Sequence, residues 1–493
     1  MISFTISLLA LVVGYMLYGR FVEHVFGPDD RLTPAVRMAD GVDYVVLPGW
    51  KIFMIQFLNI AGTGPIFGAI LGALYGPSSY LWIVFGCIFA GSVHDYFSGM
   101  LSERNDGAGM PGLVGKYLGT TMKKIMLVFS VFLLIMVGVV FVYSPAVILE
   151  RMYGTASMWV VIIFAYYILA TMLPIDKIIG RFYPIFAFSL LFLAGALMVM
   201  LFVNQPQLPE VWDGLNNLGK EQFGMKQSIF PCLFITIACG AISGFHGTQS
   251  PLMARCMKSE HQGRAIFYGA MITEGIVALI WAAVSSYFFF DGGWQQVCPP
   301  EVVEEFTAQS DKTLNQFFSA PKVVTFVCEG WLGLFGGILA ILGVVAAPIT
   351  SGDTAFRSAR LIIAEALGMQ QRDIKKRLTV SIPLFIVAMG ILFWQIDNPD
   401  GFNVIWQYFG WANQTLAVFM LWTITAYLVK AKKTYMVAFV PALFMTMVCS
   451  TFFFVSDQTL ELDQTLSYIL GGIFTAFTGV WFVMKHKDLM FDK

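Results

Sequence analysis

Four side chains that can carry charge lie within long apolar stretches of the sequence. They are His94, Asp95, His246 and Glu274. Ionisable groups are costly in lipid and usually serve a function there, so these four predict a proton path or a cation pocket. Thr350, Ser351 and Asp353 follow another apolar stretch, and their oxygen atoms suit a hard cation. Two structural alternatives stay open, namely a hydrogen-bonded pairing for His94 with Asp95 and a helix cap for Asp353.

The composition indicates what kind of protein must position these groups. Of the 493 residues, 57% are hydrophobic and 12% are charged, which is about half the charged share of a soluble domain. The mean hydropathy is +0.72. Lys and Arg number 30 against 31 Asp and Glu, so there is no basic surface for a nucleic acid. A soluble globule, a disordered chain and a nucleic-acid-binding protein are excluded, and an all-α polytopic membrane protein in a lipid bilayer remains.

About thirteen apolar stretches are long enough to cross ~30 Å of hydrocarbon as helices. They are residues 2–18, 52–75, 79–101, 125–148, 156–174, 184–203, 229–254, 266–290, 331–350, 379–396, 402–429, 435–455 and 465–484. The connections after odd-numbered helices, with the C-terminal tail, hold 25 of the 30 Lys and Arg residues. Because positively charged loops remain in the cytoplasm, we expect the N-terminus outside and the C-terminus in the cytoplasm.

Two of these helices are interrupted near their centres. The stretch 52–75 contains Ala61-Gly62-Thr63-Gly64-Pro65, where proline removes a backbone donor and the glycines weaken the helix. The stretch 229–254 contains glycines and polar residues from Gly240 to Pro251, too many for a helix interior that faces lipid. Irregular backbone at this depth is stable only when it is buried in protein or lines a wet cavity.

The spacing of the two broken helices predicts an inverted repeat. They are five helices apart and so cross the bilayer in opposite directions, as in transporters with a LeuT-like 5+5 fold. The predicted units are a first helix and loop (1–51), repeat 1 (52–203), repeat 2 (229–429) and two C-terminal helices with a tail (435–493). Kinks without any binding site are the alternative for a single break, but two breaks at matching positions favour a transporter.

The ends of broken helices predict where a solute binds. Free N–H groups at a half-helix N-terminus attract a carboxylate, and free carbonyl groups at a C-terminus attract a cation. We therefore expect a small carboxylated substrate near the two breaks. The predicted substrate-binding residues are Asn59, Gly62, Thr63, Gly64, Ser243, Gly244, His246 and Gln249, with Asn413 and Gln414 from the stretch 402–429. For Asn413 and Gln414, hydrogen bonding between helices is an equal alternative. The predicted ion-coupling residues are His94, Asp95, Glu274, Thr350, Ser351 and Asp353.

No motif predicts an enzyme, a metal centre or a cofactor. There is no C-x-x-C pair, no H-E-x-x-H and no G-x-S-x-G. Most of the seven cysteines are expected to be buried thiols, although a bridge between Cys298 and Cys328 is an alternative. An intramembrane hydrolase that uses His94, Asp95, Ser243 and His246 is a second possible function, and a membrane nutrient sensor without transport is a third.

The chain resembles the carbon starvation CstA family of bacterial inner-membrane proteins. The resemblance rests on Thr33-Pro34-Ala35-Val36-Arg37, Asp40-Gly41-Val42-Asp43-Tyr44, Ile60 to Pro65, Phe89-Ala90-Gly91 with Asp95, Ile237 to His246, Glu274, Arg357-Ser358-Ala359-Arg360, Phe409-Gly410 and Asn413-Gln414. Gln56 and His94 depart from the family pattern, which has His and Gln at these two positions. The resemblance implies a secondary transporter related to the amino acid–polyamine–organocation superfamily. It would import pyruvate or small peptides with H⁺, or alternatively Na⁺.

Overall fold

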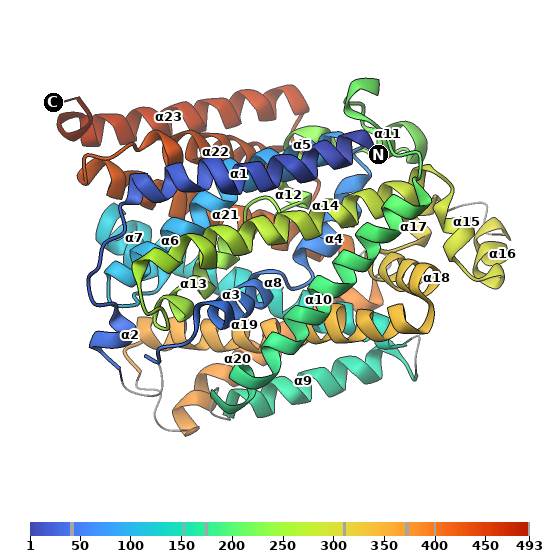
Figure 1. Cartoon of the computed structure of the whole chain (residues 1–493), viewed down its shortest axis with the longest axis horizontal. Helices are drawn as coiled ribbons and strands as arrows, with labels where there is room; N and C mark the ends of the chain where they lie inside the picture. The colour runs from blue at the N-terminus through green and yellow to red at the C-terminus, as the bar shows by residue number, and fades with distance from the viewer. Residues whose placement is uncertain are drawn as a thin grey trace.

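A computed structural model describes residues 1–39, 44–150, 153–172, 176–308, 312–369, 374–398 and 401–491. Every regular element in these ranges is helical. The block Asp40-Gly41-Val42-Asp43 lies outside the described residues. The helices run roughly along one direction, and the two termini lie at opposite ends of the bundle (Figure 1).

Ten helices of the described chain are long and apolar enough to cross a membrane, and a bent pair raises the number to eleven. The longer helices are α1 (Ile2–Phe26), α5 (Ser78–Gly86) continuing through a π-helical turn (Cys87–Gly91) into α6 (Ser92–Arg104), α8 (Thr120–Glu150), α9 (Ala156–Met172), α10 (Asp176–Asn204), α14 (Gly269–Phe290), α18 (Ala320–Ala340), α19 (Ala346–Ala366), α20 (Ile374–Asp397), α21 (Gly401–Lys430), α22 (Met436–Val455) and α23 (Gln464–Phe491). Short helices in the connections are α2 (Pro34–Arg37), α7 (Met110–Leu118), α11 (Leu218–Phe223), α15 (Gly293–Val297), α16 (Pro300–Ala308) and α17 (Leu314–Phe317).

Both predicted interruptions are confirmed. The first broken helix consists of α3 (Gly49–Ile60) and α4 (Gly64–Ala73), which meet at an angle of 48°. The second consists of a π-helical turn (Ile229–Leu233), α12 (Phe234–Thr236) and α13 (Gly244–Ala254), with a non-helical segment 237–243 between the last two. Gly240 has a φ of 93°, a conformation that glycine adopts without the penalty a side chain would add.

The two breaks lie directly against each other. A Cβ atom on Gly64 would lie 2.4 Å from Sγ of Cys239, and one on Gly68 would lie 2.9 Å from the carbonyl oxygen of Thr236. A Cβ on Gly240 would lie 3.6 Å from Cβ of Pro65. A side chain at Gly64 or Gly68 would therefore separate the two broken helices. At Gly240 the distance to Pro65 is an ordinary contact, and glycine is required there by the positive φ and by Cβ of Ala278 in α14, 2.5 Å from the Cβ position.

The expected helix at 331–350 is wrong in its boundaries. α18 bends at Gly333, whose φ is 60°, and the chain then continues through a π-helical turn (Ile341–Val345) into α19. Thr350, Ser351 and Asp353 thus lie inside a continuous helix and not beyond its end, so the alternative of a helix cap for Asp353 is wrong as well. The apolar stretch ends at residue 350 in the sequence, but the polar residues that follow are buried against protein, which allows the helix to continue.

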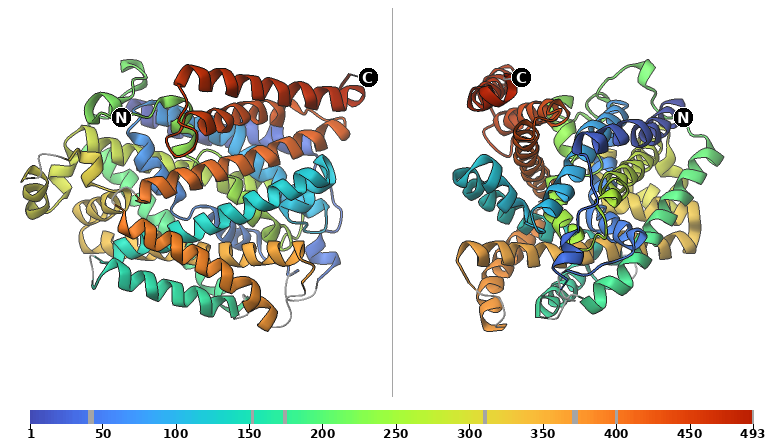
Figure 2. Two further views of the ribbon diagram at one scale, coloured as in Figure 1. Left: turned by 180° about the vertical axis from the view of Figure 1, so that it is seen from behind. Right: turned by 60° about the vertical axis from the view of Figure 1, so that its left-hand side comes forward.

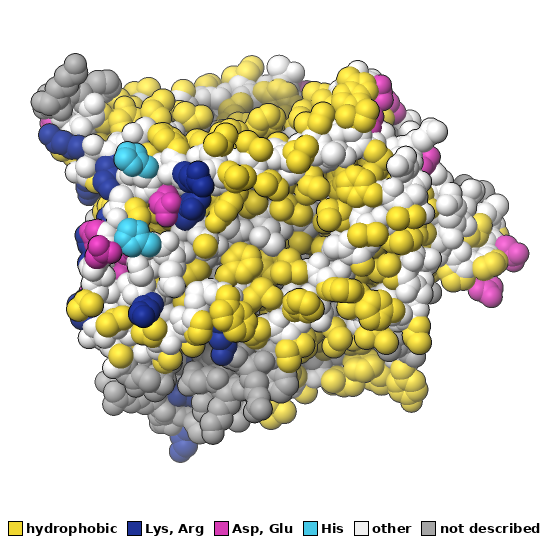
Figure 3. All heavy atoms as spheres, in the orientation of Figure 1, with side chains coloured by type: hydrophobic (Ala, Val, Ile, Leu, Met, Phe, Trp, Pro, Cys, Tyr) yellow, Lys and Arg dark blue, Asp and Glu magenta, His cyan; other side chains and the backbone are white. Residues whose placement is uncertain are grey.

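The outer surface separates into an apolar band and charged ends. In Figure 3 the Lys and Arg side chains of this face gather at the left-hand end, where the C-terminus lies, and hydrophobic side chains cover most of the middle. Helices α22 and α23 pack on each other and on α21 along one side of the bundle (Figure 2). Cys298 and Cys328 form no disulfide.

We predict that Gly91→Ala destabilises the protein by about 1–3 kcal/mol, the usual effect of overpacking. A Cβ at Gly91 would lie 2.1 Å from the carbonyl oxygen of Ala241 in the unwound segment, and backbone cannot rotate away. Gly195→Ala in α10 is the control, because nothing lies within 4 Å of its Cβ position and alanine favours a helix. The midpoint of thermal unfolding in detergent measures the stability of both variants. An unchanged midpoint of thermal unfolding for Gly91→Ala would show that the π-helical turn Cys87–Gly91 does not pack tightly against the unwound segment 237–243.

Candidate functional site

The four predicted intramembrane ionisable residues form one buried group. His94 Nδ1 donates to Oδ1 of Asp95 at 2.8 Å, and His246 Nδ1 donates to Oδ2 of the same carboxylate at 2.8 Å. On its other side, His246 Nε2 lies 3.4 Å from Oε2 of Glu274. All four side chains are fully buried. Asp95 therefore holds two imidazoles, and His246 connects the two carboxylates.

Three helices supply this group and meet closely at small residues. Asp95 and its neighbour come from α6, His246 from α13 and Glu274 from α14. A Cβ on Gly247 would lie 3.4 Å from Cε1 of His94, and a Cβ on Gly275 would lie 3.4 Å from the carbonyl oxygen of Gly240. These close approaches bring the broken helix into contact with α6 and α14.

Cys239 also belongs to this group, although it was not among the residues predicted from the sequence. One ligand atom each from Cys239, His246 and Glu274 lie within 4.8 Å of one another, and all three residues are buried. Thiol, imidazole and carboxylate are ligand types of transition metals. The only sequence signal was the position of Cys239 directly before the predicted break at Gly240, because its partner in α14 is 35 positions away.

Asn413 of α21 holds the N-terminus of α13. Its Oδ1 accepts from the backbone N–H of Phe245 at 2.7 Å, and its Nδ2 donates to Oγ of Ser243 at 3.0 Å. One N–H group that was expected to attract a carboxylate is thus already bonded by a protein side chain. For Gly244 the close neighbours are also protein, since its Cβ would lie 2.4 Å from the carbonyl oxygen of Asn413.

Side chains from neighbouring helices bond the carbonyl groups of the second break. Gln414 Nε2 donates to the carbonyl of Phe234 at 2.8 Å, and Trp406 Nε1 donates to the carbonyl of Thr236 at 3.2 Å. Trp82 Nε1 of α5 donates to the carbonyl of Ile237 at 3.0 Å. Helix–helix hydrogen bonding, one of the two alternatives for Gln414, is therefore present. Trp82 was missed, because its indole lies in an ordinary apolar stretch.

Several buried polar atoms near the breaks have no hydrogen-bond partner within the described residues. They are Oε1 of Gln56, Oδ1 of Asn59, Oγ1 of Thr63, Nε2 of His94, Oε1 of Gln249 and Oε1 of Gln414. Most buried polar atoms in proteins are bonded, so an accumulation of unbonded ones indicates a place where a ligand binds. Gly62, by contrast, packs on a ring, since its Cβ would lie 2.9 Å from Phe141.

The predicted ion-coupling residues of α19 form a separate group. Arg357 donates to Oδ2 of Asp353 at 3.5 Å and to the carbonyl of Ala170 at 3.0 Å. Thr350 Oγ1 donates to its own helix, whereas Oγ of Ser351 and Oδ1 of Asp353 have no hydrogen-bond partner among the described residues. α19 contacts α3, the first half of the first broken helix. Among the described residues, no hydrogen bond joins it to the group around Asp95.

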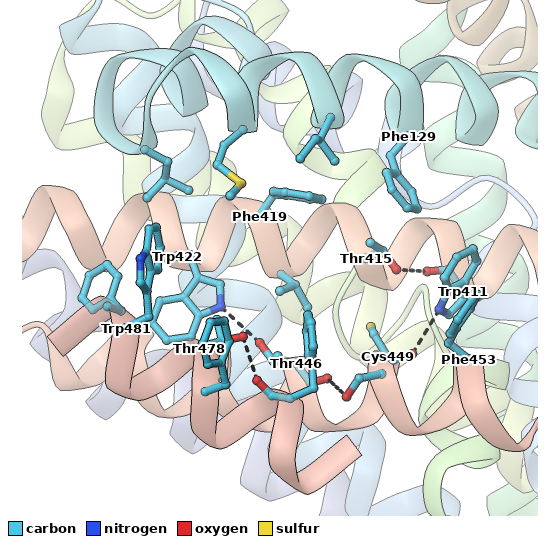
Figure 4. A pocket seen from close by; sticks show the side chains of 18 of the residues that line it. Phe129, Trp411, Thr415, Phe419, Trp422, Thr446, Cys449, Phe453, Thr478 and Trp481 are labelled. Carbon is cyan, nitrogen blue, oxygen red and sulfur yellow. Dashed lines mark hydrogen bonds between the residues drawn. The ribbon is translucent and has the colours of Figure 1, made fainter. Parts of the chain in front are cut away.

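A large groove of about 670 Å³ lies elsewhere, between α8, α21, α22 and α23 (Figure 4). Its lining is almost entirely apolar, and two of its three indole N–H groups are bonded within the protein: Trp411 to the carbonyl of Cys449 and Trp422 to Oγ1 of Thr446, both at 3.1 Å. The groove has no charged side chain in its lining and few polar ones, so the two breaks remain the candidate site for a carboxylate or a peptide.

The fold is that of LeuT-type secondary transporters. The manganese transporter of Eremococcus coleocola superimposes with a TM-score of 0.58 at 13% identity, covering 92% of this chain and 99% of that one. A Na⁺-coupled sialic acid symporter superimposes with a TM-score of 0.52 at 12% identity, covering 97% and 96% of the two chains.

The chain belongs to the carbon starvation protein CstA family, which it matches over residues 1–154, 138–327 and 321–452. The peptide transporter CstA of Escherichia coli is 25% identical over 90% of this chain and 79% of that protein. The peptide transporter CstA of Campylobacter jejuni is 27% identical over 88% and 77% of the two chains. An uncharacterized membrane protein of Haemophilus influenzae is 44% identical over 59% of this chain and 91% of its own length. The protein is thus a secondary transporter of this family and not an enzyme.

Proposed function

We propose that this protein imports small peptides, or a small carboxylate such as pyruvate, and that protons drive the import. The observation that carries the proposal is the contact between two broken helices beside a buried group of two carboxylates and two imidazoles. The relatives named peptide transporters favour a peptide as the substrate.

The substrate carboxylate would bind at the first break. α4 begins at Gly64 with Thr63 before it, and the N-terminal end of a helix attracts negative charge. Oγ1 of Thr63 and Oδ1 of Asn59 are buried without a hydrogen-bond partner among the described residues. The N-terminus of α13 is less suitable, because Asn413 already bonds the N–H of Phe245. Gln249 would complete the site from the second break through its unbonded Oε1.

The coupling proton would bind in the group formed by Asp95, His246 and Glu274. A buried carboxylate is costly unless a positive charge or a proton neutralises it. A proton taken up at Glu274 removes that cost, and the imidazole of His246 connects Glu274 with Asp95. Protonation and substrate binding at the adjoining breaks would therefore favour the same conformations. His94 would support the group by holding the second oxygen of Asp95.

Sodium is the alternative coupling ion, because α19, which contacts α3 of the first broken helix, offers oxygen ligands. Oγ of Ser351 and Oδ1 of Asp353 are buried and unbonded among the described residues, and Thr350 adds a hydroxyl one position earlier. Oxygen atoms of this kind suit a hard cation. Uptake that follows a sodium gradient and ignores a proton gradient would favour this group.

We predict that Glu274→Gln removes gradient-driven uptake in proteoliposomes. A proton-motive force of about 100 mV supplies about 2.3 kcal/mol per proton, which supports about 50-fold accumulation of a neutral dipeptide. The variant should instead reach only the outside concentration, because glutamine cannot carry the proton. Labelled dialanine and pyruvate are the substrates to follow.

The matched control is Glu329→Gln in α18, whose side chain is exposed. This variant should accumulate substrate as the unchanged protein does. Uphill uptake by Glu274→Gln would assign coupling to other residues. Absence of uptake of peptides and of pyruvate by the unchanged protein, under every ion gradient, would contradict the proposed function itself.

We predict an orientation with the N-terminus outside and the C-terminus in the cytoplasm of the bacterial inner membrane. The two termini lie at opposite ends of the bundle, and Lys and Arg gather on the visible face at the C-terminal end (Figures 1 and 3). A green fluorescent protein fused to the C-terminus should fluoresce, whereas an alkaline phosphatase fused there should be inactive. The opposite pair of results would reverse the orientation.

A further inference from the structure

We infer that Cys239, His246 and Glu274 bind one divalent transition-metal ion of the zinc class. This metal binding is a property separate from transport, because it depends only on the ligand atoms of these three side chains. It stands on their geometry, on the way His246 is oriented and on the types of ligand atom.

The ligand atoms are close to the arrangement that a metal ion requires. Metal–ligand bonds of about 2.0–2.3 Å in a tetrahedral site place the ligand atoms about 3.3–3.8 Å apart. His246 Nε2 and Glu274 Oε2 already lie 3.4 Å apart. Sγ of Cys239 lies within 4.8 Å of both residues' ligand atoms, so a shift of about 1 Å or a rotation of the thiol completes the three-ligand set.

The hydrogen bonds of Asp95 orient the imidazole for metal binding. His246 donates Nδ1–H to Oδ2 of Asp95 at 2.8 Å, which leaves the lone pair of Nε2 on the side of Glu274, 3.4 Å from Oε2. His94 fixes the other carboxylate oxygen at 2.8 Å. A carboxylate that accepts the second N–H of a ligating histidine is a recurrent feature of zinc sites.

An independent observation also indicates a ligand. Nε2 of His246 and both carboxylate oxygens of Glu274 are buried and have no hydrogen-bond partner within the described residues. A hydrogen-bond network that served packing alone would pair these atoms. A metal ion would satisfy one atom of each residue, and the remaining oxygen of Glu274 could bind it as well.

The ligand types select among metals. A thiolate with an imidazole favours Zn²⁺ and Co²⁺ over Mg²⁺, Ca²⁺ and Mn²⁺, which prefer oxygen ligands. Cys239 must lose its thiol proton to the solvent when the ion binds, so the thiolate and the Glu274 carboxylate together balance two positive charges. Three protein ligands leave a fourth position for water.

The experiment uses the full-length protein, purified in detergent and stripped of metal. Addition of Co²⁺ should produce the near-ultraviolet charge-transfer absorption of a cobalt–thiolate bond, with one ion bound per chain by elemental analysis. Zn²⁺ should displace the cobalt and remove the absorption, whereas Mn²⁺ should not. No bound cobalt, or binding without the thiolate absorption, would overturn the inference.

Cys239→Ser tests the assignment to this thiol, with Cys449→Ser as the control because Cys449 is buried in α22, away from the break. Cys239→Ser should lose the absorption, and Cys449→Ser should retain it. Persistence of the band in Cys239→Ser would assign it to another cysteine and contradict the site. Asp95→Asn, which changes the positioning of His246 without removing a ligand, should weaken Co²⁺ binding by about 10–100-fold while keeping the absorption at saturation. Undiminished affinity in Asp95→Asn would contradict the orienting role.

One consequence rests on the proposed function, since the metal would occupy His246 and Glu274, the groups proposed to carry the coupling proton. Zn²⁺ should then inhibit proton-driven uptake by the unchanged protein. The two proposals fail separately: a missing cobalt absorption refutes the metal site even if uptake is observed, and missing uptake refutes the transport proposal even if the absorption is present.

Discussion

The structure depends on one constraint: backbone groups freed from a helix in the middle of a membrane must be bonded inside the protein. Each unsatisfied N–H or carbonyl exposed to hydrocarbon costs several kcal/mol, on the order of the whole stability of a domain. Trp82, Trp406 and Gln414 bond carbonyls of the second break, and Asn413 bonds the N–H of Phe245. The surrounding helices therefore hold the break open at a fixed position.

The same constraint explains the glycines and the buried charges. Because each break must be enclosed by protein, Gly64 allows the first break to lie against Cys239 of the second, and Gly91 allows its π-helical turn to approach the carbonyl of Ala241. Enclosure also removes water, so the ionisable side chains that reach the breaks must satisfy one another. Asp95 does this by accepting from two histidines. Nε2 of His246 lies 3.4 Å from Oε2 of Glu274, but neither atom has a hydrogen-bond partner among the described residues.

The helix breaks and the intramembrane ionisable residues could be predicted from the residue types within each apolar stretch. Glycine and proline within apolar stretches located both breaks, and the rarity of charge in lipid singled out His94, Asp95, His246 and Glu274, which the structure brings together. Roles for these residues and for Asn59, Thr63 and Gln249 stay predictions. What the sequence could not give was pairing through space: Cys239 is distant from Glu274 in sequence, and Trp82 looks like any lipid-facing aromatic. The end of the helix at 350 was misjudged because hydropathy does not distinguish burial in protein from exposure to water.

The central claim is that the two adjoining breaks form one substrate site. The most direct test is a cryo-electron microscopy structure of the protein in a lipid nanodisc with a dipeptide bound. The account predicts substrate density bounded by Asn59, Thr63 and Gln249, with its carboxylate at the start of α4. Density in the apolar groove beside α22 and α23, or a dipeptide bound without contact to either break, would contradict it.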